Sequence, residues 1–232
     1  MQPVNRLHPE IITLCATFVS DDDPRPIIPL THVCRYWRRT ITSSPGNWAS
    51  LSSSWRALVP FCLERAGTVP LAMGITVDCQ SSKFKRDRKL FLGFIPHFSR
   101  TFRLSLAWDT SIDDISDDLP GFLDTSMPSL TFPDLRQKRG SFRSSAVLEP
   151  PLFQNLSKLK SLCLARVAPY PTIFKVSTLV ELKLRGYEAF CFERLLELLR
   201  SNQNLESVTL DLEFSEDTVP AFPEGAISLP KL

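Results

Sequence analysis

The chain has 232 residues, of which 43% are hydrophobic, with 27 basic and 25 acidic side chains. The net charge of +2 gives no overall field that attracts nucleic acid or an anionic membrane, so we expect neither as a partner. Sixteen phenylalanines and four tryptophans exclude a disordered chain, and the eight glycines form no phosphate-binding or dinucleotide-binding fingerprint.

Cysteine and histidine show no pattern of a metal or catalytic site. The six cysteines include no C-x-x-C pair, and the three histidines lie outside known hydrolase or zinc-protease motifs. We therefore expect no metal, no cofactor and no enzymatic activity. Buried free thiols are typical of a reducing compartment, which favours the cytoplasm or the nucleus. No stretch reaches the roughly 18–20 apolar residues that a membrane-spanning helix needs.

The first 51 residues predict three short helical elements. A helix begins at Pro9, and its apolar side chains recur at helical spacing: Ile11, Leu14, Cys15 and Phe18. A second helix is predicted after Pro29, with an apolar stripe of Leu30, Val33, Cys34, Trp37 and Ile41. Ser43–Gly46 ends that helix, and a short turn leads to Trp48 and Leu51.

The middle of the chain alternates between helix and strand signals. Residues 55–66 predict a helix that ends before Gly67, and residues 70–78 predict a strand. A basic run over residues 83–89 leads into a helix over 90–98, and residues 104–108 alternate as a strand does. Residues 113–150 lack clear periodicity, and we interpret them as an irregular repeat or an exposed insertion.

The last third contains repeats of the pattern L-x-x-L-x-L. Three units carry it: Leu159, Leu162 and Leu164; Leu179, Leu182 and Leu184; Leu205, Val208 and Leu210. The leading leucines are 20 and 26 residues apart, close to the period of leucine-rich repeats. Phe192, Leu195, Leu196 and Leu199 predict a covering helix, which a simple hairpin meander would not explain. Leu229–Leu232 resembles the start of another unit, so we expect the sequence to stop inside a repeat.

These patterns predict an α+β or α/β solenoid. We expect a helical motif over residues 1–54, followed by irregular strand-helix units of leucine-rich-repeat type over residues 55–232. Strand side chains alternate between two faces. If the leucines point inward, six polar side chains line the outer face and are candidates for substrate binding: Glu181, Lys183, Arg185, Ser207, Thr209 and Asp211.

The N-terminal block resembles the F-box motif in the form found among fungal F-box proteins. The matching residues are Leu7, Pro9, Glu10, Ile11, Ile12 and Phe18, then Val33, Cys34, Arg35, Trp37 and Arg38, then Pro45, Trp48 and Leu51. The run V-C-R-Y-W-R-R, with a second tryptophan eleven residues after Trp37, is the most specific part. Three positions depart from the family pattern, namely His8, Cys15 and Ala16, and the turn over residues 21–29 also varies from it.

The resemblance implies a non-catalytic subunit of a ubiquitin ligase. An F-box binds a Skp-type adaptor, which connects it to a cullin, while the C-terminal repeats hold a protein substrate. The alternative is an interaction scaffold whose degenerate F-box no longer recruits the ligase.

The resemblance also assigns roles to individual side chains. We expect five apolar residues to contact the adaptor: Leu7, Pro9, Ile11, Ile12 and Trp48. Four others are expected to hold the three helices together: Phe18, Val33, Cys34 and Trp37.

Overall fold

The computed structural model describes seven stretches of the chain: residues 7–19, 25–77, 82–108, 127–137, 158–166, 178–190 and 192–214. The chain divides into two compact units, Met1–Ile75 and Thr76–Leu232. This division lies later in the chain than the boundary expected after residue 54. The final Leu229–Leu232, expected to start another repeat, lies outside the described residues.

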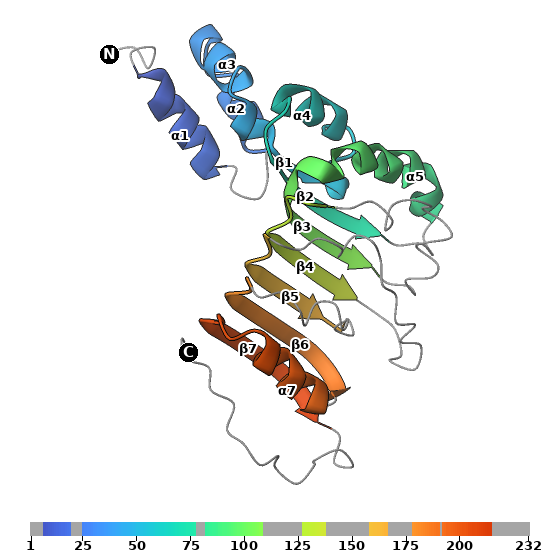
Figure 1. Ribbon diagram of the computed structural model, residues 1–232. Helices are drawn as coiled ribbons and strands as arrows, with labels where there is room; N and C mark the ends of the chain where they lie inside the picture. Colours follow the sequence, from blue (N-terminus) through green and yellow to red (C-terminus); the bar gives the residue numbers. More distant parts are fainter. Residues whose placement is uncertain are drawn as a thin grey trace. The chain divides into compact units, whose positions relative to one another are not determined.

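The protein has an α/β fold built on a parallel sheet (Figure 1). Within the described ranges, seven strands follow one another across this sheet in chain order, from β1 to β7. Their bounds are β1 (Ser50–Ser52), β2 (Leu71–Val77), β3 (Thr101–Trp108), β4 (Phe132–Gln137), β5 (Ser161–Ala165), β6 (Glu181–Phe190) and β7 (Ser207–Phe214). No helix in the described part of the chain is both long enough and apolar enough to cross a membrane.

In the first unit, helix α1 (Pro9–Val19) packs against α2 (Ile27–Leu30), α3 (Arg35–Thr42) and the 3-10 turn η2 (Pro45–Trp48). The single helix predicted after Pro29 is wrong, because the chain leaves the helical conformation between α2 and α3. Cys34 is extended there, and its Sγ accepts a hydrogen bond from the backbone N–H of Trp37 at 3.5 Å. This cap begins a new helix.

A second group of elements completes the first unit. The turn η3 (Ser53–Trp55) precedes helix α4 (Val59–Ala66), which packs on η2 and β1. The helix predicted over 55–66 therefore begins later, with Pro60 in its first turn. Gly67 ends it with a φ of +53°, a conformation that favours glycine.

The second unit is a stack of parallel strands. Helix α5 (Ser82–Phe94) and the turn η4 (Ile95–Arg100) precede β3, and helix α7 (Phe192–Ser201) connects β6 to β7. Strands β5, β6 and β7 lie where the L-x-x-L-x-L units predicted them, and α7 is the predicted covering helix. Figure 1 shows β3 to β7 side by side.

Register aligns the inward side chains of neighbouring strands into continuous rows. In one row, Leu162 pairs with Leu182, which pairs with Val208. In the next row, Leu164 pairs with Leu184, which pairs with Leu210. The leading leucines Leu159, Leu179 and Leu205 are all completely buried. The repeated leucines other than the exposed Leu210 therefore form the apolar core of this unit.

Strand β4 lies within the region expected to be irregular. The sequence around it reads as a further unit, with Leu130, Pro133 and Leu135 at the three leucine positions. Pro133 pairs with Leu104 of β3, and Leu135 pairs with Leu106 and Leu164. Proline is rare in central strands, so the sequence pattern did not predict a strand here. Residues 113–126 and 138–150 lie outside the described ranges.

We expect the leucines of these rows to contribute less to the free energy of unfolding toward β7. Leu184 is 0% exposed and Leu210, its partner on β7, is 43% exposed. Leu184→Ala should therefore lower the free energy of unfolding by about 2–5 kcal/mol. Leu210→Ala should lower it by less than about 1 kcal/mol. Urea denaturation of the two full-length variants measures the difference, and equal losses would contradict the assigned core.

Candidate functional site

Helix α1 presents an apolar stripe to solvent. Its members follow the helical period and are all exposed: Ile11, Leu14, Cys15 and Phe18. Phe18 is 86% exposed and Leu14 is 65% exposed, values that are unusual for side chains of this size. We call these four residues the α1 stripe. Exposed apolar patches of this kind mark interaction sites.

The opposite face of α1 explains why the stripe points outward. Ile12 and Ala16 are completely buried and face the neighbouring helices. Beside them the contact is polar. The hydroxyls of Thr13 and Ser44 lie 3.2 Å apart within a hydrogen bond, and Thr17 donates to the side-chain oxygen of the buried Asn47 at 3.2 Å. A helix that packs on one side turns one face inward, and on α1 that face makes these contacts.

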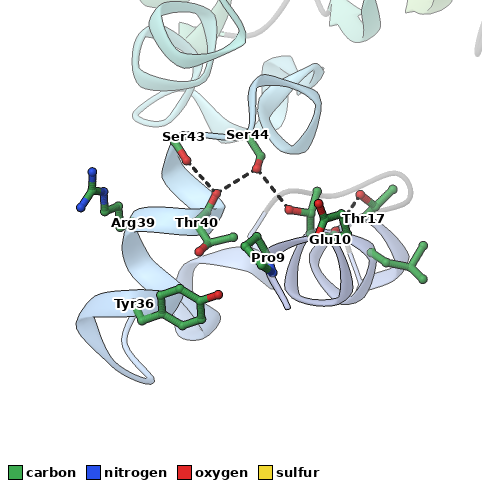
Figure 2. Close-up of a pocket in the computed structure, with 10 residues that line it drawn as sticks. Pro9, Glu10, Thr17, Tyr36, Arg39, Thr40, Ser43 and Ser44 are labelled. Carbon is green, nitrogen blue, oxygen red and sulfur yellow. Dashed lines mark hydrogen bonds between the residues drawn. The ribbon is translucent and has the colours of Figure 1, made fainter. Parts of the chain in front are cut away.

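An open groove of about 640 Å³ lies between α1 and α3 (Figure 2). Ten residues line it: Pro9, Glu10, Thr13, Leu14, Thr17, Tyr36, Arg39, Thr40, Ser43 and Ser44. Its α3 end is held by hydrogen bonds, since the hydroxyls of Ser43 and Ser44 both donate to the carbonyl oxygen of Thr40. Leu14 belongs to both the groove and the α1 stripe, so the two features form one surface.

The residues expected to contact the adaptor divide into two groups. Leu7, Pro9 and Ile11 are exposed, and the Tyr36 hydroxyl donates to the Leu7 carbonyl at 3.0 Å. For Ile12 the expectation of an accessible anchor is wrong, because its side chain is completely buried.

Trp48 is likewise not an accessible anchor, since it is only 2% exposed. Its indole N–H donates to the carbonyl oxygen of Ile41 at 3.2 Å. Its ring makes an edge-to-face contact with Phe61 of α4, with 5.1 Å between the ring centroids. The residue thus joins α3 to α4 within the core of the first unit.

The expected core residues of the motif also divide. Trp37 is buried, while Cys34 is partly buried and caps α3. For Phe18 and Val33 the expected core position is wrong, because their side chains are 86% and 50% exposed. Val33 lies in the break between α2 and α3, where no helical face carries it inward. Leu14 and Cys15 were not assigned to the surface, although their spacing with Ile11 marks them as members of one stripe.

The polar side chains expected on the outer face of the sheet do lie together. Glu181 and Lys183 are half-buried, whereas Arg185 and the three β7 positions are exposed. Register sets them in three rows across β5, β6 and β7: Ser161, Glu181 and Ser207; Cys163, Lys183 and Thr209; Ala165, Arg185 and Asp211.

Two acids on this face are neutralised by neighbours on their own strands. Glu181 pairs with Lys183 at 2.5 Å and accepts a hydrogen bond from Ser161 at 2.6 Å, and these contacts lower the pKa of Glu181. Asp134 accepts two hydrogen bonds from Arg136, at 2.8 and 2.5 Å. Burial, together with Asp134, raises the pKa of the Cys163 thiol, so this cysteine stays protonated.

Within the described ranges, no group of three or more His, Cys, Asp or Glu side chains is placed to hold a metal ion. Comparison of the chain with protein-family models, curated proteins and solved structures found no match. The arrangement of the two surfaces therefore carries the functional argument.

We expect Lys183→Met to raise the pKa of Glu181 toward its ordinary value of 4.5, because the ammonium group is the largest cause of the lowering. In the native protein the pair contributes stability above pH 4.5, and this contribution is lost as the pH falls through the lowered pKa. NMR titration of the carboxylate carbon measures the shift. Ser161→Ala should raise the pKa by less, and an unchanged pKa in Lys183→Met would contradict the assignment.

Proposed function

We propose that the chain is the substrate-recognition subunit of a Skp-cullin-F-box ubiquitin ligase. Residues 7–51 act as the F-box that binds a Skp-type adaptor, and the strand stack acts as a leucine-rich-repeat solenoid that holds a protein substrate. The protein itself makes and breaks no bond. It raises the effective concentration of the substrate near the conjugating enzyme, in the cytoplasm or the nucleus.

One observation carries the adaptor-binding part of this proposal, namely the exposed α1 stripe. Ile11, Leu14 and Phe18 are exposed to water. A polypeptide that covers them is bound more tightly, by about 1.5–3 kcal/mol for each large side chain fully buried. The groove beside the stripe accommodates part of the same partner. Leu7 and Pro9 extend the surface at the N-terminal end of α1.

Charge around this surface supports an acidic adaptor. The described residues of the first unit contain six arginines and two acids, Glu10 and Glu64, of which Glu10 lines the groove. Arg35 and Arg39 lie exposed on α3, and Arg39 lines the groove. Opposite charges on the partner steer association and fix its orientation, while the apolar stripe provides the affinity.

Repetition within the second unit supports the solenoid. The carbonyl oxygens of Thr131, Lys160 and Val180 stand at the same place in successive turns. Each accepts hydrogen bonds from two backbone N–H groups of the next turn, at distances between 2.8 and 3.2 Å. A chain that repeats one supersecondary unit in this way builds a continuous core and a continuous outer face.

The double variant Ile11→Asp, Phe18→Asp should weaken binding of a Skp-type adaptor by about 100-fold or more, because it places two carboxylates where the adaptor buries apolar surface. Calorimetry with the full-length chain and a purified adaptor measures the loss. Both side chains are exposed, so the melting temperature should stay unchanged.

Leu210→Asp is the matched control, since it places a carboxylate at an exposed leucine of the second unit. It should leave adaptor binding intact. Unchanged binding by the α1 double variant would remove the stripe from the interface. A wild-type chain that captures neither adaptor nor cullin would overturn the ligase proposal in favour of an interaction scaffold.

A further inference from the structure

Two arginines lie on the outer face of the sheet on either side of β5. Arg136 of β4 pairs with Ala165 of β5, and Ala165 pairs with Arg185 of β6. Because neighbouring strands are about 4.8 Å apart, the two arginine backbones are separated by roughly 10 Å. Only the methyl group of Ala165 stands between them in this row.

Both guanidinium groups act on the same part of β5. Each of them opposes the rise in the pKa of the Cys163 thiol that burial and Asp134 cause. Cys163 precedes Ala165 by two residues on the same face of the strand. Both guanidinium groups therefore lie within electrostatic range of the Cys163 thiol.

Charge on this part of the face is not balanced. Over β4 and residues 181–185 of β6, three cations lie beside two acids, and both acids are bonded to a cation on their own strand. The remaining cation is Arg185. Among the described residues no carboxylate lies within ion-pair distance of Arg185, although Asp211 is its Cα partner on β7. An arginine side chain with unused donors binds carboxylate or phosphate oxygens well.

The other end of the same face is aromatic. Phe132 of β4 lies four residues before Arg136, and the guanidinium of Arg103 lies 5.7 Å from the centre of its ring. Along a strand this separation is about 13 Å. Aromatic and arginine side chains are the types that contribute most to protein interfaces. The face thus offers an aromatic ring with the Arg103 guanidinium beside it at one end, and the guanidinium groups of Arg136 and Arg185 at the other.

We propose that the outer face of β4 to β6 binds an extended segment of a partner protein that carries an anionic side chain between Arg136 and Arg185. An apolar side chain four residues away in the same segment contacts Phe132. The anion is a carboxylate or a phosphate group, since both have oxygens that a guanidinium recognises. This inference rests on the proposed role as a substrate receptor and names the class of substrate segment.

The probe is a set of immobilised peptides of eleven residues, presented to the full-length chain. The central residue is glutamate, phosphoserine or glutamine, and a leucine or a serine stands four positions away on either side. Glutamate or phosphoserine peptides should bind about tenfold more tightly than glutamine peptides, with a further gain from one of the two leucine positions. The stronger of the two acidic sets identifies the source of the anion.

Arg185→Gln and Arg136→Gln should each abolish this preference for acidic peptides. Arg200→Gln, which removes an exposed arginine from α7, is the matched control and should keep it. Circular dichroism checks that each variant is folded. Equal binding of acidic and glutamine peptides by the wild-type chain, or an unchanged preference in Arg185→Gln, would overturn the inference.

The adaptor-binding variant separates this inference from the proposed function. Ile11→Asp, Phe18→Asp should retain the peptide preference, because its changes lie in the first unit. If the wild-type chain binds no adaptor but prefers acidic peptides, only the ligase proposal fails. If it binds the adaptor without that preference, only the present inference fails.

Discussion

The register of the parallel strands determines both surfaces of the second unit. In each turn one backbone carbonyl accepts two N–H groups from the next turn, as Lys160 does from Val180 and Glu181. This contact fixes the start of each strand against its neighbour, so that residues of the same parity align. A shift of one residue would move every leucine to the outer face. The same register therefore sets both the buried rows and the polar rows.

In the first unit, polar contacts decide which face of α1 is free. Thr13 and Thr17 bond to Ser44 and Asn47, and Ile12 and Ala16 are completely buried. Isolated apolar periodicity would place the α1 stripe inward, because it is the most hydrophobic side of the helix. The structure places it outward, and the core of the first unit is built from other side chains, among them Ile12, Ile41 and Trp48. Burial of Trp48 compensates in part by joining α3 to α4.

The two units thus carry different kinds of interaction surface. The first has an apolar stripe with a basic border, which gives affinity through burial. The second has a polar face on which most charges are already paired, so that selectivity comes from the few groups left over, such as Arg185. This division fits the proposed substrate receptor, because strong general binding to one constant partner and selective binding to a variable one have different physical origins.

The sequence by itself determined the strands of the repeats and the outer positions of the polar residues, because alternation along a strand is a local property. It also identified α1, whose proline and periodicity act within a single helix. Only the tertiary structure decided the roles of Phe18, Val33 and Trp48, and it revealed β4 in spite of Pro133. The burial of a side chain and the pairing of a strand depend on their neighbours in space, and residues distant in the sequence supply those neighbours.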